Sequence, residues 1–233
     1  MKLALFDLDH TLLDGDSDTL WCQFLIDEGL LDRASFEPRN QAMERDYRAG
    51  VVGVQAFCDF YVGTLAGRSR ADWLPLRERF WHERVQPLLH HGTAALLAGH
   101  RARGDLLVLS TATNRFITEL TAQGLGIAHL IATEVAWANS VCTGRTEGVL
   151  NMREGKLTRL QHWLAARGLD DAGQQRALAE AWFYSDSSND LPLLGAVGHP
   201  VVVHPDARLR AHAQARGWPV TSLRARPGTP PAG

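Results

Sequence analysis

The stretch Lys2-Leu-Ala-Leu-Phe-Asp7-Leu-Asp9-His-Thr11 places two carboxylates directly after a hydrophobic run. Such a run predicts a strand buried on both faces. Because side chains two residues apart on a strand point the same way, Asp7 and Asp9 should converge at its carboxyl end, where open α/β sheets bind ligands. Adjacent carboxylates repel each other unless a hard cation lies between them, and Mg²⁺ prefers oxygen ligands. Taken alone, however, the pair is better explained as turn or helix-capping residues.

Composition limits the classes of function. The chain has 233 residues, of which 45% are hydrophobic and 21% charged, as expected for a soluble globular protein with a sizeable core. Its formal net charge of −2 gives no basic face, which argues against a nucleic-acid partner. The cysteines are few and scattered, which is typical of reduced thiols in the cytoplasm. No apolar run is long enough for a signal-peptide core or a membrane span, so we expect no membrane association.

The hydrophobic periodicity divides the chain into two kinds of structure. Residues 15–87 contain four stretches of helical periodicity, at about 17–29, 37–48, 52–65 and 71–84, and no convincing strand. Residues 88–222 alternate between the two patterns. Helices are predicted at 93–103, 115–123, 156–167, 190–194 and 207–216, and strands at 106–110, 130–135, 141–146, 181–185 and 201–204. We therefore predict an α/β fold with a mostly parallel sheet covered by helices on both faces, interrupted by an all-helical insertion.

Three further segments carry polar side chains where a strand ends or a helix begins. The strand at 106–110 runs into Thr111-Ala112-Thr113-Asn114, which is either a phosphate cradle at a helix amino terminus or simply a helix cap. The strand at 181–185 runs into an acidic loop from Asp186 to Asp190. Lys156 begins a helix, where a cation opposes the macrodipole, so either an anion lies nearby or the lysine is solvated.

The ordered set Asp7-Leu-Asp9-His-Thr11, Thr111, Lys156 and Asp186 to Asp190 resembles the four motifs of the haloacid dehalogenase superfamily. The long interval between the first two motifs is similar to that of the phosphoserine-phosphatase-like branch. This resemblance implies a Rossmann-like catalytic core formed by residues 1–14 and 88–222, a helical cap domain at 15–87 and a loop-like tail at 223–233.

The resemblance also implies chemical roles for the matched residues. Asp7 would be the nucleophile that forms an aspartyl-phosphate, and Asp9 would act as general acid and then as general base. Mg²⁺ would be held by Asp7, Asp186 and the main-chain carbonyl of Asp9. Thr111 and Lys156 would stabilise phosphoryl oxygens. Because pumps and dehalogenases of the superfamily lack a carboxylate two residues after the nucleophile, the resemblance implies a phosphatase, a phosphoric monoester hydrolase.

Other matched residues would have supporting roles. Phosphate or substrate would be contacted by Ala112, Asn114 and Asn189. Asp190 would orient the lysine from behind, and Thr11 would support the turn leading to the cap, unless it is only a strand-end residue.

The substrate predicted by the resemblance is a small phosphorylated metabolite of amino-acid metabolism. Asp16 matches the glutamate that takes the substrate amine in phosphoserine phosphatases, and its acidic neighbours favour a cationic group, although helix capping and solubility explain them as well. The cap arginine that binds the carboxylate of phosphoserine has no clear counterpart at residues 55–62. The segment starting at Thr111 looks more like bacterial histidinol-phosphate phosphatases, with phosphoserine as the alternative substrate.

Two other classes of protein share part of this pattern. A phosphoacceptor signalling domain also gathers acidic residues, a threonine, a lysine and Mg²⁺ on a parallel sheet, but the long helical insertion argues against it. A non-catalytic binding protein could retain the fold, since fold does not imply function. Catalytic turnover distinguishes both classes from a phosphatase.

Overall fold

The fold is built on one sheet, seen in a computed structural model that describes residues 1–48 and 51–224. Within these residues the sheet has seven strands in the order β4-β3-β2-β1-β5-β6-β7. The strands are β1 (Leu3–Phe6), β2 (Leu106–Asn114), β3 (His129–Ala138), β4 (Val141–Glu147), β5 (Trp182–Ser185), β6 (His199–Val203) and β7 (Val220–Thr221). Neighbouring strands pair in parallel, apart from the antiparallel pair β3 and β4. The predicted α/β class is confirmed.

Strand β1 lies in the middle of the sheet, and all four of its residues are buried. It pairs with β2 on one side, where Leu3 lies opposite Leu106, and with β5 on the other, where Phe6 lies opposite Tyr184. The chain therefore leaves β1 toward one edge and later returns on its other side, which makes the carboxyl end of β1 a topological switch point. Ligands of open α/β sheets bind at such a point, and Asp7 is the first residue beyond it.

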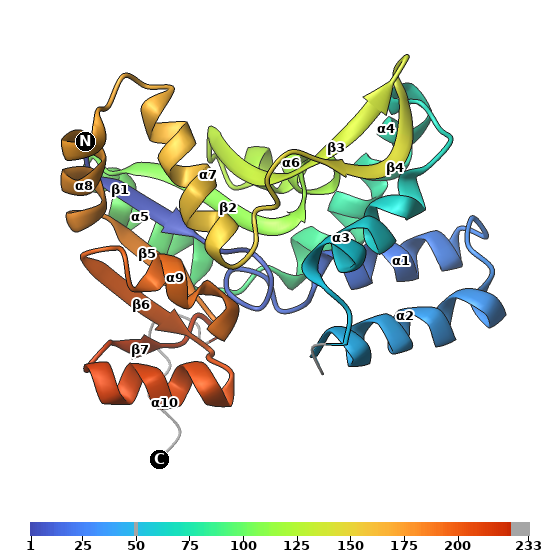
Figure 1. Cartoon of the computed structure of the whole chain (residues 1–233). Helices are drawn as coiled ribbons and strands as arrows, with labels where there is room; N and C mark the ends of the chain where they lie inside the picture. The colour runs from blue at the N-terminus through green and yellow to red at the C-terminus, as the bar shows by residue number, and fades with distance from the viewer. Residues whose placement is uncertain (49–50, 225–233) are drawn as a thin grey trace.

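Helices cover both faces of the sheet (Figure 1). On one face, α5 (Thr93–Ala102) and α6 (Arg115–Gly124) pack Leu97 and Phe116 against Phe6 of β1. The opposite face carries α7 (Glu154–Ala165), α8 (Asp171–Ala179), α9 (Leu191–Leu194) and α10 (Ala207–Arg216). Alternate residues of β1, Leu3 and Leu5, point to that second core. The two apolar layers explain why β1 reads as a continuous hydrophobic run.

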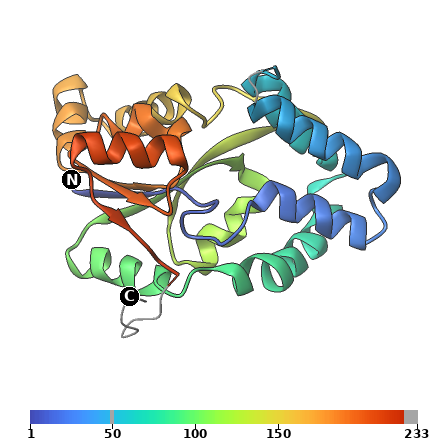
Figure 2. The ribbon, with the colours of Figure 1, turned by 90° about the horizontal axis from the view of Figure 1, so that it is seen from below.

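The segment between β1 and α5 forms a helical lobe beside the sheet (Figures 1 and 2). It contains α1 (Ser17–Asp27), α2 (Arg33–Arg48), α3 (Val54–Val62) and α4 (Arg70–Phe80). Trp21 of α1 packs edge to face on Trp73 and Phe80 of α4, in the same apolar cluster as Phe6 of the sheet. The long hairpin of β3 and β4 reaches over to this lobe, where Asp59 of α3 accepts hydrogen bonds from the amide and hydroxyl of Thr146.

Two elements were absent from the expectation based on periodicity. Helix α8 buries only Ala177 and Leu178, so its sequence lacks a strong apolar stripe. Strand β7 has two exposed residues and pairs with β6. The expected tail at 223–233 begins with a buried residue, Leu223, and residues 225–233 lie outside the described part of the chain. Among the described helices, none combines the length and apolar character needed to cross a bilayer.

Candidate active site

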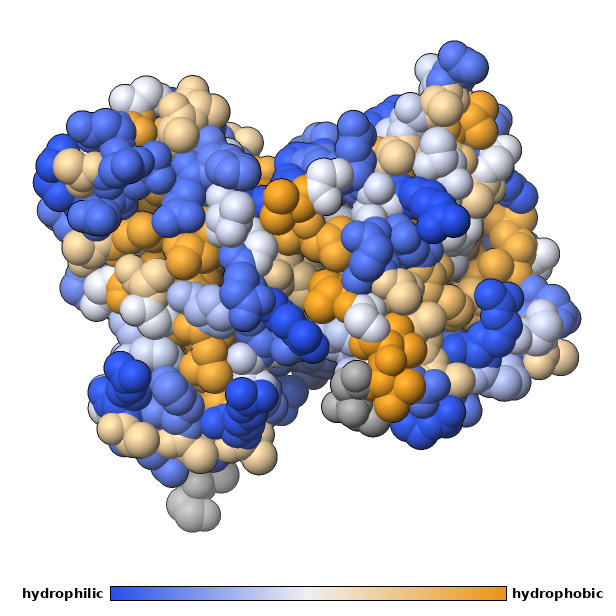
Figure 3. Space-filling view, viewed as in Figure 1, coloured by the Kyte–Doolittle hydropathy of each residue, from blue (hydrophilic) through white to orange (hydrophobic). Residues whose placement is uncertain are grey.

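A cavity of about 560 Å³ opens where the carboxyl edge of the sheet faces the helical lobe. This volume lies in the range of sites for small metabolites. The front surface of the molecule is hollowed between the two lobes (Figure 3). Strand ends contribute Asp7, Asp9, Asp186 and Asp190 to its lining, and the helical lobe contributes further acidic and aromatic side chains. The cavity therefore brings together the four carboxylates that the sequence placed at strand ends.

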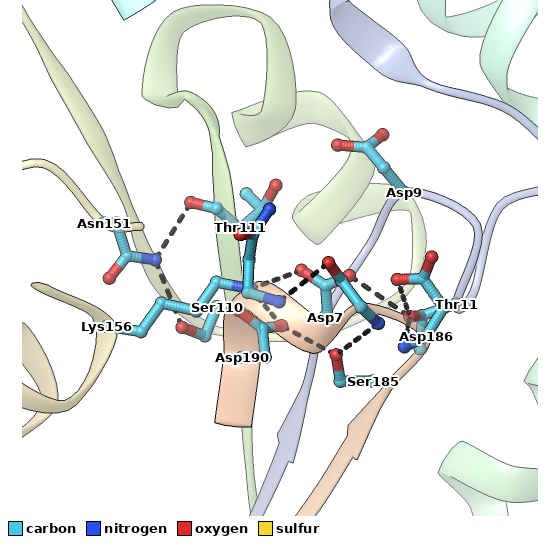
Figure 4. Close-up of polar contacts among 12 residues, drawn as sticks. Asp7, Asp9, Thr11, Ser110, Thr111, Asn151, Lys156, Ser185, Asp186 and Asp190 are labelled. Atoms are coloured by element: carbon cyan, nitrogen blue, oxygen red, sulfur yellow. Dashed lines mark hydrogen bonds and ion pairs between the residues drawn. The ribbon is translucent and has the colours of Figure 1, made fainter. Parts of the chain in front are cut away.

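Lys156 is the central cation of the site (Figure 4). Its Nζ lies 2.7 Å from Asp7 Oδ1 and 2.7 Å from Asp190 Oδ2, and the residue is only 2% exposed. Burial by itself would lower the pKa of Lys156, but Asp190 and Asp7 outweigh it, so the pKa is raised and the ammonium stays charged. Asp190 also accepts a hydrogen bond of 2.7 Å from the Ser185 hydroxyl. Asp190 thus holds Lys156 against Asp7.

Asp186 lies next to Asp7 through a shared threonine (Figure 4). Thr11 Oγ1 is 3.1 Å from Asp7 Oδ2 and 3.3 Å from Asp186 Oδ1, and it accepts a 3.0 Å hydrogen bond from the Asp186 amide. A hydroxyl has one hydrogen, so it donates to only one of these carboxylates at a time. Burial and the neighbouring Asp7 and Asp190 raise the pKa of Asp186 to about 9. This carboxyl is therefore costly to ionise without a cation beside it.

Asp9 lines the same cavity but points away from the Asp7 and Asp186 carboxylates (Figure 4). Strand β1 ends at Phe6, so the expected convergence of Asp7 and Asp9 along a regular strand is wrong. The Ser17 amide donates to Asp9 Oδ1 at 2.7 Å, and Thr113 Oγ1 donates to Asp9 Oδ2 at 2.8 Å. Burial, and then Asp16 and Asp7, raise the pKa of Asp9 to about 7. Asp9 is thus a carboxyl that exchanges a proton near neutral pH.

The start of α7 is shaped to deliver Lys156 to the site. A Cβ at Gly155 would lie 2.0 Å from the Leu150 carbonyl oxygen, so only glycine permits this close approach. Asn151 is fully buried, and its Nδ2 lies within 3.1 Å of Ser110 Oγ and 2.9 Å of the Thr111 carbonyl. These bonds join the loop before α7 to β2. Asn151 was not predicted from the sequence, because nothing in its neighbourhood marks a buried polar anchor.

Acidic side chains of α1 form part of the cavity wall. Asp16 caps the helix, since its Oδ1 accepts a 2.8 Å hydrogen bond from the Thr19 amide, and it also lines the cavity. Asp18 is partly buried, with Oδ2 3.3 Å from Thr113 Oγ1. Burial, Asp16 and Asp9 raise the pKa of Asp18 well above its ordinary value. Asp16 therefore has the capping role considered as the alternative, and it lies at the cavity as well.

The cradle expected after β2 is only partly present. Ala112 and Thr113 line the cavity, and so does Asn189 from the acidic loop. Thr111 is fully buried behind the lining, where its Oγ1 accepts a 3.2 Å hydrogen bond from the Thr113 amide. Asn114 does not reach the cavity, because its Oδ1 caps α6 by accepting from the Ile117 amide at 3.2 Å. The expected substrate contact of Asn114 is thus corrected to a helix cap.

Sequence reasoning missed the other wall of the cavity. Tyr47 of α2 and Phe57 of α3 lie there with Met152 and Arg153 from the loop before α7. The Arg153 guanidinium lies 5.3 Å from the centre of the Tyr47 ring, and among the described residues it forms no ion pair. Phe57 follows the helical spacing that is also typical of core aromatic residues. No sequence signal separates a core aromatic from one at a cavity, since both follow the same helical spacing.

No three histidine, cysteine or acidic side chains within the described ranges are grouped so as to hold a metal ion by themselves. A Mg²⁺ site does not need such a group, since Mg²⁺ commonly keeps several waters and uses one or two carboxylates. Asp7 and Asp186, joined through Thr11, are a donor pair of that kind.

Comparison with known proteins gives consistent relationships. The model of the haloacid dehalogenase-like hydrolases matches residues 4–195. A histidinol-phosphatase from Neisseria meningitidis serogroup C is 38% identical over 224 residues, covering 96% of this chain and 99% of the relative. A phosphoserine phosphatase from Mycobacterium tuberculosis is 30% identical over 98% of this chain and 75% of its own length.

Solved structures agree in fold. A protein of unknown function from Bordetella pertussis Tohama I superposes with a TM-score of 0.88 at 42% identity, covering 95% of this chain and 98% of that one. A substrate-bound phosphoserine phosphatase superposes with a TM-score of 0.67 at 15% identity, over 97% and 93% of the two chains. The second likeness concerns the fold alone.

Proposed function

Since this chain belongs to the haloacid dehalogenase-like hydrolase family, we propose that it hydrolyses phosphomonoesters through an aspartyl-phosphate formed on Asp7. The chain is a phosphatase, as its family and its histidinol-phosphatase relative indicate. Our proposal adds the intermediate, a requirement for Mg²⁺ and the substrate, a small amino-phosphate such as histidinol phosphate.

One observation carries the proposal: a buried carboxylate, Asp7, is held at a cavity between a cation and a second carboxylate. Asp7 is 6% exposed, with Oδ1 bonded to Lys156 and Oδ2 bonded to Thr11, which also contacts Asp186. A nucleophile needs this fixed orientation, because proximity and alignment lower the barrier to attack. The surrounding charges suit a phosphoryl group, whose transfer depends mainly on positioning and electrostatic stabilisation.

In the first half-reaction, an Asp7 oxygen attacks phosphorus and the bond from phosphorus to the ester oxygen breaks. The electron pair stays on the leaving oxygen, which takes a proton from the Asp9 carboxyl. Asp9 lies on the cavity wall with its pKa raised to about 7, so the acid form is populated at neutral pH. Lys156 places a positive charge beside Asp7, where it stabilises the phosphoryl oxygens.

In the second half-reaction, ionised Asp9 takes a proton from water, and the water oxygen attacks phosphorus. The bond between phosphorus and Asp7 breaks, which restores the carboxylate and releases phosphate. Ser17 and Thr113 hold Asp9 in one orientation through both steps, since each donates a hydrogen bond to a different oxygen of the carboxylate. Asp9 thus alternates between acid and base without a change of partner.

The residues present fit a magnesium ion. The pKa of Asp186 is raised by burial and by Asp7 and Asp190, because the single positive charge of Lys156 does not balance these carboxylates. Asp7 and Asp186, with the main-chain carbonyl of Asp9, would hold Mg²⁺ together with water molecules. When bound, the ion would neutralise charge on the phosphoryl oxygens.

The acidic wall supports an amine on the substrate. Asp16, the N-cap of α1, and Asp18 in its first turn line the same cavity as Asp7 and Asp9. Asp16 Oδ1 caps the helix, and Asp16 Oδ2 makes no hydrogen bond within the described residues. An ammonium group is the natural partner for such a carboxylate. Histidinol phosphate carries an amine and no carboxylate, which agrees with this wall and with the 38% identical relative.

Phosphoserine is the second candidate, favoured by Arg153. This guanidinium lines the cavity and forms no ion pair within the described residues, so it could take the carboxylate of phosphoserine. The arginine that was not found at residues 55–62 would then be supplied by the loop before α7.

Phosphate release from a set of phosphate esters, with and without Mg²⁺, tests the proposal. We expect release to require Mg²⁺ and kcat/KM to be highest for histidinol phosphate, followed by phosphoserine and then by sugar phosphates. Asp16→Asn should lower the ratio of kcat/KM for amino-phosphates to kcat/KM for sugar phosphates about 10-fold, the loss of one charge-assisted bond, because any change it causes in the pKa of Asp9 affects both classes of ester. Equal rates with amino-phosphates and sugar phosphates would contradict the assignment of the amine site.

The pH dependence tests the role of Asp9. Because its pKa is raised to about 7, the acid form is lost as pH rises through that value. We expect kcat/KM for an alkyl phosphate to fall about 10-fold per pH unit above that pH. p-Nitrophenyl phosphate, whose leaving group needs no proton, serves as the control and should give a much flatter profile. Identical profiles for the two esters would argue against Asp9 as the proton donor.

A further inference from the structure

The cavity has a second wall that the proposed chemistry does not use. We define the aromatic wall as Tyr47, Phe57 and Met152, all of which line the cavity that contains Asp7 and Asp9. Its members come from three separate segments: the end of α2, the first half of α3 and the loop before α7. These segments are separate in the sequence, so the wall forms only when the chain is folded.

The rings of the aromatic wall pack closely on one another. The ring centres of Tyr47 and Phe57 are 4.1 Å apart, with their planes tilted by 31°. The Tyr47 hydroxyl lies 3.5 Å from Met152 Sδ, which connects the helical lobe to the loop that leads into α7. Phe57 is further fixed by an edge-to-face contact with Tyr61 at 5.0 Å. The wall is therefore a braced apolar surface, with Phe57 only partly buried.

The position of the wall is tied to the phosphoryl site. Met152 is four residues before Lys156, and Asn151 anchors the same loop to β2. One short segment thus fixes both the cation beside Asp7 and one edge of the wall. Because the wall lines the same cavity as Asp7 and Asp9, a leaving group attached to a phosphoryl group at Asp7 would lie in the space that this wall borders.

We propose that the aromatic wall binds a flat, unsaturated ring on the leaving group of the substrate. The juxtaposition of two aromatic rings and a thioether favours an aromatic partner, since stacked or edge-to-face ring pairs and sulfur–ring contacts each add to simple area burial. The acidic wall of Asp16 and Asp18 lies in the same cavity. The preferred substrate class is therefore a phosphate monoester with a short linker, an ammonium group and a ring. This inference rests on the proposed function in that the cavity binds the leaving group.

The test compares esters with and without a ring. 2-Phenylethyl phosphate and ethyl phosphate both lack an amine, so their comparison isolates the ring. For the wild type we expect kcat/KM to be about 5- to 30-fold higher for the ester with the ring, the range that one or two kcal/mol of contact corresponds to. Phe57→Leu and Tyr47→Leu should each remove most of this preference by raising KM, with kcat within about twofold, as expected when ground-state binding is lost.

Matched variants separate recognition from a structural role. Phe60→Leu makes the same change one turn later on α3, where Phe60 stacks on Phe36 and does not line the cavity. It should keep the ring preference, and so should Tyr47→Phe, which retains the ring. Equal loss of activity on both esters in Phe57→Leu and Tyr47→Leu, or loss of preference in Phe60→Leu, would overturn the inference.

The design distinguishes this inference from the proposed function. If the wild type shows no preference for amino-phosphates, the amine assignment fails, while the ester pair without an amine still decides the role of the wall. Histidinol phosphate and ethanolamine phosphate both carry an amine, but only the first carries a ring. The inference is supported if the wild type, Phe60→Leu and Tyr47→Phe prefer histidinol phosphate while Phe57→Leu and Tyr47→Leu do not. Absence of a ring preference in the wild type would overturn it even where a variant does not fold.

Discussion

Asp7→Asn should lower kcat for phosphate release by at least about 10⁴-fold, the scale seen when a covalent nucleophile is removed. The amide keeps the volume of the carboxyl and an acceptor oxygen for Lys156, but it cannot form the acyl phosphate. Initial rates with histidinol phosphate and saturating Mg²⁺ measure the loss.

The variant should remain folded. Lys156 keeps Asp190 as its partner, and removal of one negative charge relieves repulsion on Asp186. Denaturant unfolding of the Asp7→Asn variant should therefore give a stability equal to or above that of the wild type in the absence of metal. A kcat within about 10-fold of the wild type, in a folded variant, would contradict the assignment of Asp7 as the nucleophile.

Lys156→Met should reduce both catalysis and stability. Removal of the cation beside Asp7 takes away electrostatic stabilisation that is commonly worth about 10²- to 10³-fold in kcat. It also leaves Asp7 and Asp190 buried without their ion-pair partner, and breaking one side of such a pair costs about 3–5 kcal/mol in the free energy of unfolding. Steady-state kinetics and denaturant unfolding measure the two effects separately.

The loss of stability in Lys156→Met should depend on pH. A carboxyl whose pKa is raised in the folded state contributes stability at pH values below its ordinary pKa near 4, and this is lost as pH rises through the folded value. Asp186, with its pKa raised to about 9, is such a group, and loss of Lys156 should strengthen the effect. In metal-free buffer, Lys156→Met should go on losing stability above about pH 9, where the loss in the wild type levels off, because removal of the ammonium raises the pKa of Asp186 further.

Asp190→Asn provides the control for the lysine. It removes one partner of Lys156 but leaves the contact with Asp7 and the charge at the phosphoryl site. We therefore expect a smaller fall in kcat than in Lys156→Met. If both variants lose activity equally, Lys156 acts through its orientation by Asp190 more than through its charge.

The sequence predicted the residues that follow strands, for a physical reason. Parallel strands end at one edge of a sheet, so Asp7 and the loop from Asp186 to Asp190 had to meet whatever the details of packing. For Lys156, the helix amino terminus left either a nearby anion or a solvated side chain, and the family resemblance favoured the first. In the structure that anion pair is Asp7 and Asp190.

Other features could not be predicted, because they depend on how helices face one another. Phe57 and Phe60 lie one turn apart on α3, yet only Phe57 reaches the cavity. Asn114 has the right chemistry for a phosphate contact and for a helix cap, and only the structure distinguishes them. Asp9 was expected to follow the strand, but β1 ends before it and its carboxyl turns to Ser17 and Thr113.

Acid quenching during turnover, followed by mass spectrometry of peptides, tests the central claim most directly. The protein is mixed with histidinol phosphate and Mg²⁺ and quenched at intervals shorter than one turnover. We predict a phosphoryl group on the peptide that contains Asp7, which appears before free phosphate, decays as phosphate accumulates and is absent in Asp7→Asn. Free phosphate without any phosphorylated peptide, or a phosphoryl group on another residue, would contradict the account.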